Sequence, residues 1–318
     1  MTWYLVRRVG QAVAVVVGVM ILTFILIHAE PGSAARAVLG LKATPARVAL
    51  FNRLYGLDKP IYQQFVIYVK NVVHGNLGTS YSLQQPVSTL IAQRLPRDVV
   101  LLGISTVLAL LIGVPMGIYQ ALRHNMLVDD VIAGTWFTLY SAPDFMEALL
   151  LIGLLCVQFH WLQATFPGGI TSVASILADW RALILPVVVL AINTVAGFSQ
   201  YARSSAIQQL AADYIRVVRA KGLPERLVVL RHLLRNSLMP IVTILGLSLP
   251  DIVGGAIIAE AIFNFPGMGL LFWQAALSHD FPVLLGTTLI VGVAAVVGNL
   301  LADVTYAMLD PRIRYASA

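Results

Sequence analysis

Long apolar runs divide the chain into segments. Stretches of about 20 residues with few or no charges recur along it, which is the length a helix needs to cross the hydrocarbon core of a membrane. An even number of such helices would place both termini on one side. The pattern predicts six membrane-spanning helices, over residues 9–28, 99–122, 131–159, 182–202, 238–260 and 282–305.

The segment between the first two runs, residues 29–98, has a different pattern. Apolar residues recur at helical spacing in ATPARVALFNRLYGL (43–57) and in PIYQQFVIYVKNVVHG (60–75), and Gly-Asn, Gly-Thr and Gln-Pro pairs punctuate the rest of the segment. We expect two or three short amphipathic helices packed on the outer membrane face. They either cap the helical bundle or dock a partner outside.

Composition supports a membrane protein and excludes a soluble one. The 318 residues are 58% hydrophobic and only 11% charged, with a mean hydropathy of +0.83, whereas soluble domains carry about 25% charged residues. The pI of about 9.6 does not indicate nucleic-acid binding, because the basic residues flank apolar runs. The single cysteine, Cys156, excludes an intramolecular disulfide and a cysteine metal cluster.

The basic residues predict the orientation of the chain. Arg7, Arg8 and Arg123, seven basic residues between 203 and 235, and Arg312 and Arg314 fall on one side, whereas Arg181 alone lies in the short loops of the other side. Short cytoplasmic loops are enriched in Lys and Arg, so the termini and the 203–237 loop are expected to be cytoplasmic. The 29–98 segment carries eight basic residues, but the rule is weak for long loops. The run after Arg8 is too long for a signal peptide and predicts an uncleaved first helix.

The 203–237 loop contains a predicted helix-turn-helix hairpin. DYIRVVRAK and ERLVVLRHLLRNSL both have helical patterns, and Gly222 and Pro224 separate them. Its charge alone is also consistent with an anchor to anionic lipid.

Motifs for chemistry are missing from the sequence. It contains no GxxxxGK[ST], GxSxG or Rossmann glycine pattern, no TVGYG filter and no HExxH. We therefore expect no catalysis, metal site or nucleotide binding by this chain.

Several motifs carry a resemblance to a known family. AKG, RHLLRN and the following proline in the 213–240 stretch resemble the cytoplasmic EAA-like loop of ATP-binding-cassette (ABC) importer permeases of the dipeptide/oligopeptide/nickel class. LVRRVGQAVAVVVGVMILTFILIHAEPGSAAR, GLDKPIYQQFVIYVKNVVHGNLGTSY, GGAIIAEAIFNFPGMGLLFWQAALSHDFPVLLG and NLLADVTYAMLDPRIR are similar to further parts of these permeases, in order. The resemblance covers essentially the whole chain, and the long 29–98 segment resembles that of the B-type subunit.

The resemblance implies a type I ABC importer permease fold, all-α and integral to the membrane. Residues 1–28 would be the N-terminus and first helix, 29–98 an extracytoplasmic scaffold, and 99–318 the permease core. It implies a multi-pass protein of a prokaryotic cell (inner) membrane, surrounded by lipid, with these partners: a second permease, two ATPase subunits or domains, and an extracytoplasmic substrate-binding protein. The ATPase, and not this chain, would use ATP and Mg²⁺.

Transport of di- or oligopeptides is the implied function, with nickel, glutathione or haem as alternative substrates. A secondary transporter driven by an ion gradient is a more distant alternative, because it leaves the hairpin without a role.

The resemblance also implies site residues. The ATPase-coupling surface would comprise Asp213, Tyr214, Arg216, Arg219, Ala220, Lys221, Gly222, Glu225 and His232. Arg216 occupies the position of the glutamate in the wider superfamily's EAA consensus. Glu260, Phe263, Pro266 and Gly267 would lie near an outer gate, where they either have a structural role or contact substrate.

Three acids interrupt the predicted spans: Asp144 and Glu147 in the third, one helical turn apart, and Asp251 in the fifth. A charge at the bilayer centre costs about 2.5–3.5 kcal/mol or more, so these side chains should face protein or water. They either pair with the partner permease, or are protonated and bonded to backbone, or line the translocation path. Our hypothesis is the path, with a preference for substrates that carry a cationic group such as a peptide α-amine.

Overall fold

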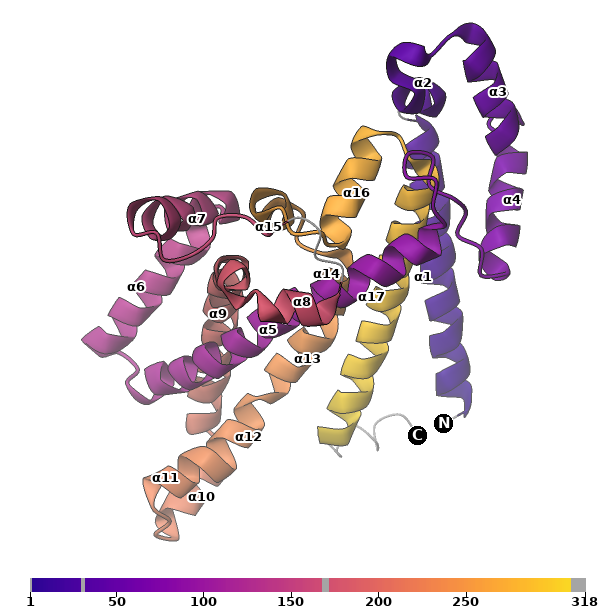
Figure 1. The fold of residues 1–318 in the computed structure, drawn as a ribbon. Coiled ribbons are helices and arrows are strands. Elements are labelled where there is room, and N and C mark those ends of the chain that lie inside the picture. The colour runs from indigo at the N-terminus through magenta and orange to yellow at the C-terminus, as the bar shows by residue number, and fades with distance from the viewer. Residues whose placement is uncertain (1, 30–31, 168–171, 310–318) are drawn as a thin grey trace.

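The computed structural model describes residues 2–29, 32–167 and 172–309, so the tail with Arg312 and Arg314 lies outside the described residues. Within these ranges the regular secondary structure is helical, apart from one β-bridge between Thr79 and Pro86. The short helices α2–α4 lie at one end of the molecule, and the α10 (Asp213–Ala220) and α11 (Glu225–Leu227) hairpin lies at the opposite end (Figure 1).

Five helices of the described chain are long and apolar enough to cross a membrane, or six if one bent pair counts as a span. They are α1 (Thr2–Ala29), α5 (Val87–Leu122), α9 (Trp180–Leu210), the stretch Glu225–Gly254, and α17 (Phe281–Leu309). The stretch Glu225–Gly254 combines α11, a π-helical segment Val228–Leu233, α12 (Leu234–Ser237), α13 (Met239–Leu247) and α14 (Leu249–Gly254). The prediction of an all-helical membrane protein is therefore confirmed.

The predicted third span, 131–159, is not one straight helix. It consists of α6 (Leu127–Ser141) and α7 (Asp144–Leu151), the latter continued by a π-helical segment Ile152–Gln158, with a bend of 99° between them. Ala142 is extended, with ψ at 136°, because the ring of the following Pro143 disfavours the helical conformation there.

Two other helix bounds differ from the sequence pattern. Helix α5 begins at Val87, so the predicted scaffold boundary after residue 98 falls inside a continuous helix. The predicted fifth span, 238–260, is interrupted because Gly255 has a φ of +78°, which ends the helix. Glu260 consequently lies in a separate short helix, α15 (Ile257–Phe263), which is followed by α16 (Met268–Leu277).

Within the 29–98 segment, helices α2 (Ala34–Leu39), α3 (Pro45–Tyr55) and α4 (Ile61–Val73) and a 3-10 turn precede the start of α5. Thr44 caps α3 and Pro45 occupies its first turn, while Gly56 ends it at a φ of +69°. The short helices predicted within 43–57 and 60–75 are thus confirmed.

Asp280 ties the 29–98 segment to the start of α17. Its buried carboxylate accepts hydrogen bonds from Ser80 Oγ at 2.6 Å and from the backbone N–H groups of Tyr81 and Ser82 at 3.0 Å. Burial, with further contributions from Asp280 and Tyr55, raises the pKa of Tyr81 above its usual range.

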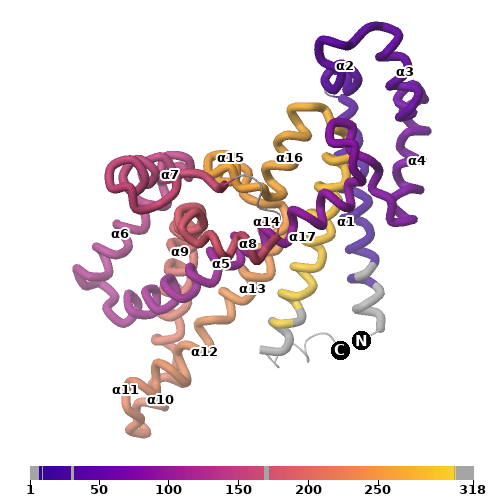
Figure 2. Tube along the Cα trace, in the orientation of Figure 1, coloured from indigo at the N-terminus to yellow at the C-terminus, as the bar shows by residue number. Residues whose placement is uncertain are grey.

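The most extensive helix packing in the described part joins α5 to α9, and the tube in Figure 2 shows the two helices crossing. Gly113 and Gly117 make this approach possible, because a Cβ on either would overlap the backbone of α9 at Val195 or Ser199. The buried Ser199 Oγ also donates to Gln120 Oε1 at 3.0 Å. This helix pair forms the centre of the fold.

Candidate functional site

The α10–α11 hairpin continues directly from a central helix. Only Ala211 and Ala212 separate the end of α9 from α10. The chain reverses at Gly222, whose φ is +74°, and Pro224 precedes α11. Apolar side chains anchor the hairpin, since Ile215, Val228 and Leu233 are all fully buried.

Most of the predicted coupling residues gather on the exposed tip of this hairpin. Asp213 and Arg216 have side chains that are 94% and 74% exposed. Arg219 and Glu225 pair across the turn at 2.6 Å, and the hydrogen bond from Glu225 raises the pKa of Arg219. The remaining exposed members of the predicted surface are Ala220, Lys221 and Gly222.

Tyr214 and His232 are only half-exposed. The Tyr214 hydroxyl donates to Gln209 Oε1 at 2.8 Å and accepts from Asn236 Nδ2 at 2.9 Å. Tyr214 therefore joins the end of α9 to α12 inside the chain, a role that the sequence pattern did not indicate.

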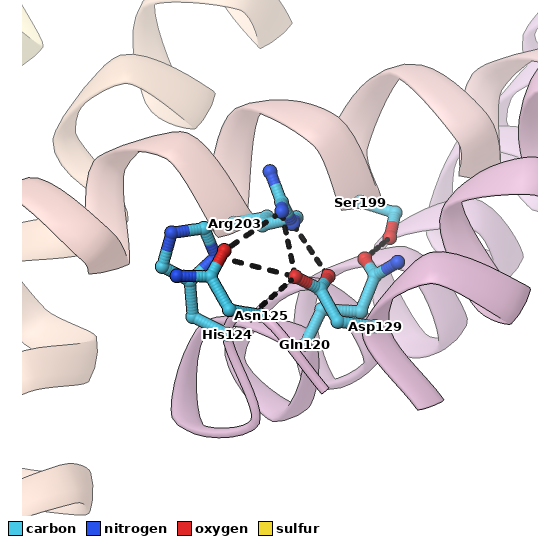
Figure 3. A network of polar contacts seen from close by, with 6 residues as sticks. All are labelled: Gln120, His124, Asn125, Asp129, Ser199 and Arg203. Carbon is cyan, nitrogen blue, oxygen red and sulfur yellow. Dashed lines mark hydrogen bonds and ion pairs between the residues drawn. The ribbon is translucent and has the colours of Figure 1, made fainter. Parts of the chain in front are cut away.

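A polar cluster at the same end of the central helices was not predicted (Figure 3). Asp129 in the first turn of α6 is buried and accepts two hydrogen bonds from Arg203 of α9, each 2.7 Å long. His124 Nδ1 and the backbone N–H of Asn125 lie 3.2 and 3.3 Å from the same carboxylate. This cluster connects the α5–α6 turn to the helix that leads into the hairpin. An aspartate and a distant arginine were visible in the sequence, but nothing local paired them.

The three acids of the predicted spans do not form one cluster. Asp144 is exposed and accepts a hydrogen bond from Asn193 of α9, whereas Glu147 is 5% exposed. Neither carboxylate oxygen of Glu147 has a hydrogen-bond partner among the described residues. Asp251 is exposed on α14, which packs against α5 and α17, whereas α7 packs against α9 and α15. The structure thus brings Asp144 and Glu147 together and leaves Asp251 on a different packing surface.

The predicted outer-gate residues lie around a buried acid. Glu260 is fully buried, and its two oxygens accept the backbone N–H groups of Ala256 and Leu270, both at 2.7 Å. Phe263 is also buried, and its carbonyl accepts the N–H of Phe166 at 2.7 Å. These contacts favour the structural alternative for this group.

Two residues of α5 that the sequence pattern did not single out complete the cluster around Glu260. Asp98 Oδ2 accepts the N–H of Met268 at 2.6 Å, and Arg97 Nη1 donates to the carbonyl of Pro266 at 3.2 Å. A Cβ on Gly267 would overlap the carboxylates of both Asp98 and Glu260. The glycine at 267 therefore allows this turn to close over the two acids.

A cavity of about 430 Å³ lies between the 29–98 segment and the ends of α1 and α17. Aromatic side chains line it, including Phe24, Tyr68 and Phe281, together with the basic Arg53 and Lys59. Burial raises the pKa of Tyr68 to about 12. Within the described ranges, no three His, Cys, Asp or Glu side chains lie close enough to hold a metal ion.

Comparison with known proteins covers the whole length of the chain. The family described as "Binding-protein-dependent transport system inner membrane component" matches residues 113–315, and the N-terminal family of the same systems matches residues 1–102. The chain is 39% identical to the oligopeptide transport system permease protein AppB of Bacillus subtilis, over 99% of this chain and 100% of that protein.

Two further relatives show the same coverage. A putative peptide permease protein of Brucella suis is 36% identical, over 98% of each chain, and a probable peptide ABC transporter permease protein of Sinorhizobium fredii is 34% identical, over 98% of this chain and 99% of that protein. The match extends through the α10–α11 hairpin, the central helices and the cluster around Glu260 alike. The chain therefore belongs to the family of inner membrane components of binding-protein-dependent transport systems, as a permease subunit of the ABC importer type.

Proposed function

We propose that this chain is one of two permease subunits of an ATP-driven importer of di- or oligopeptides in a prokaryotic inner membrane. Full-length similarity to permeases named for peptide transport supports the substrate class. In this proposal the α10–α11 hairpin and both termini are cytoplasmic, and the bent α6–α7 pair is the sixth span. The 29–98 segment is an outer scaffold that faces the substrate-binding protein.

One observation carries the coupling role: the exposed polar hairpin continues directly from α9. The hairpin presents Asp213, Arg216 and Lys221 to a soluble partner, while buried Leu233 packs in one cluster with Ala202 and Ala206 of α9. A partner ATPase that closes on ATP and Mg²⁺ would displace the tip and move α9 with it. The chain itself binds no cofactor in this scheme.

The Asp129–Arg203 pair extends this connection to α6. Because α9 also packs closely on α5 at Gly113 and Gly117, α5, α6 and α9 would move as one body. Asp144 and Glu147 lie in α7, beyond the bend that follows α6. Because α7 packs against α9, movement of α9 would reach them. These two acids and Asp251 would line the translocation path and favour substrates with a cationic group.

Copurification tests the proposal. An affinity-tagged chain should bring an ATPase subunit and a second permease out of the membrane. Arg216→Glu, which reverses a charge on the exposed tip, should release the ATPase. Lys70→Glu is the matched control, because it makes the same charge reversal in α4 at the far end of the molecule. A chain that transports alone in liposomes on a proton gradient would instead support the secondary-transporter alternative.

Substrate class needs a separate assay. Peptide, nickel, glutathione and haem uptake should be compared in cells that express the whole importer. Uptake confined to one of the last three would replace the peptide assignment and leave the ABC permease role intact.

A further inference from the structure

Two buried carboxyl groups face each other where α5 meets the turn between α15 and α16. Asp98 and Glu260 are both fully buried. A Cβ placed on Gly267 would overlap Asp98 Oδ1 and Glu260 Oε2, so both oxygens border the space beside this glycine. A Cβ on Gly255 would overlap the remaining oxygens, Glu260 Oε1 and Asp98 Oδ2. The two glycines therefore enclose a carboxyl pair from both sides.

Hydrogen-bond donors are distributed unequally over the four oxygens. Backbone N–H groups of Ala256 and Leu270 donate to the two oxygens of Glu260, and that of Met268 donates to Asp98 Oδ2. Asp98 Oδ1 is buried without a hydrogen-bond partner in the described part of the chain. Donors to a carboxylate favour its ionised form, so Glu260 is the ionised member. The same distribution favours Asp98 as the acid and its Oδ1, which has no donor, as the site of the proton.

The charged groups near the pair are two arginines of the helix that carries Asp98. Arg94 and Arg97 of α5 are the cations that act on it, and Arg97 Nη1 also donates to the Pro266 carbonyl, which holds part of its guanidinium on the backbone of the turn. Helix α16 contributes no titratable side chain. Two like charges confined to one buried space strongly disfavour double ionisation.

We propose that Asp98 and Glu260 share one proton between Oδ1 and Oε2, and that this proton-linked pair is a positioning element for the outer turn. The pair connects residues 264–270 to two helices, because the Met268 N–H donates to Asp98 of α5 and the Leu270 N–H donates to Glu260 of α15. Removal of the proton from the outer aqueous side would leave two facing carboxylates, and their repulsion would release the turn. No proton is consumed, since it moves only between the two oxygens and water.

The proposal goes beyond peptide transport and has a readout that needs no substrate. The purified importer complex is heated in detergent at a series of pH values, and the unfolding midpoint is recorded. The midpoint of the wild type should fall by several degrees as the pH becomes alkaline. Asp98→Asn should abolish this fall, because the amide keeps an oxygen for Met268 N–H and offers a fixed N–H to Glu260, as protonated Asp98 does.

Two further variants complete the design. Asp98→Leu removes both hydrogen bonds and should lower the midpoint and the uptake at every pH. Asp58→Asn, on the exposed surface of the 29–98 segment, makes the same chemical change as Asp98→Asn and should keep the alkaline decline. The infrared difference spectrum between the wild type and Asp98→Asn at neutral pH should show a protonated carboxyl band that only the wild type has.

Two outcomes would overturn the proposal, and a third would contradict only the proposed function. If Asp98→Asn lowers the midpoint at every pH as Asp98→Leu does, Asp98 is ionised and paired with the arginines. An unchanged alkaline decline in Asp98→Asn would place the responsible proton elsewhere. Absent peptide uptake in the wild type, with an alkaline decline that Asp98→Asn abolishes, would contradict the proposed substrate and support the shared proton.

Discussion

Arg203 binds both carboxylate oxygens of Asp129, with Nε and Nη2 each 2.7 Å from one oxygen. The two residues are 74 positions apart in the sequence. Asp129 is 1% exposed, so its charge depends on this arginine and on His124. The pair joins the beginning of α6 to the helix that leads into the α10–α11 hairpin.

Breaking the Asp129–Arg203 pair should lower the stability of the protein markedly. Arg203→Ala would leave Asp129 buried without its main partner, and removal of one member of a buried pair typically costs about 3–5 kcal/mol. We expect the unfolding midpoint of the complex to fall markedly and transport to be lost, while binding of the ATPase at the hairpin tip persists. Unfolding in denaturing detergent, together with copurification, measures both effects.

The hairpin ion pair provides the matched control. Arg219→Ala removes an arginine from a carboxylate partner in the same way, but Arg219 and Glu225 are 45% and 56% exposed. Exposed pairs contribute at most about 1 kcal/mol. Equal destabilisation by the two substitutions would contradict the role assigned to Asp129.

Gly222 should be required for its backbone conformation alone. Its φ is +74°, and a Cβ there would meet no atom within 4 Å. Gly222→Val should therefore strain the turn by about 1–2 kcal/mol and reduce ATPase binding and ATP-driven uptake. Gly222→Asn is the control, because asparagine tolerates this conformation better. Similar losses in both variants would show that any side chain at position 222 disturbs contact with the partner, whatever its backbone preference.

Gly117 should be essential for the approach of α5 to α9. Gly117→Ala places a methyl group against the Ser199 carbonyl and Ala202 Cβ, and such overpacking costs about 1–3 kcal/mol. Gly103→Ala in the same helix meets nothing within 4 Å and should be neutral or stabilising. Thermal unfolding of the two purified variants makes the comparison. Equal stability would mean that the helices separate without cost.

The intramembrane acids should differ in their effect on substrate choice. Asp144→Asn and Asp251→Asn remove charge from exposed side chains and should reduce uptake of cationic peptides several-fold while neutral peptides are less affected. Glu147→Gln should have a smaller effect, because Glu147 is buried. Uptake of cationic and neutral peptides at the wild-type ratio in all three variants would refute the path hypothesis.

Asp280 should hold the 29–98 segment in place. Asp280→Ala would leave the buried Ser80 hydroxyl and two backbone N–H groups without their acceptor, at a cost of about 1–3 kcal/mol for each unsatisfied group. We expect limited proteolysis to cut within residues 32–86 of the variant first. Asp58→Ala, which changes an exposed aspartate of the same segment, should be cleaved like the wild type.

The sequence pattern predicted correctly those features that depend on residues close together in the chain. Apolar runs predicted the membrane helices, and the helical spacing within 43–57 and 60–75 predicted α3 and α4. Gly222 and Pro224 placed the turn of the hairpin correctly, because both act on the backbone at their own positions. The bend after α6 also has a local cause in Pro143, but the apolar run continues across it and concealed the break.

Tertiary structure decided which polar groups meet. The sequence by itself determined an all-helical membrane protein with an exposed basic hairpin, since hydrophobic length and turn residues are read along the chain. It did not determine the pairing of Asp129 with Arg203, of Asp98 with Glu260, or of Asp280 with the 80–82 turn. Those partners come together only through the close packing that glycines such as Gly113, Gly117 and Gly267 permit. The contacts of a buried charge depend on the angles at which helices cross, which no local pattern records.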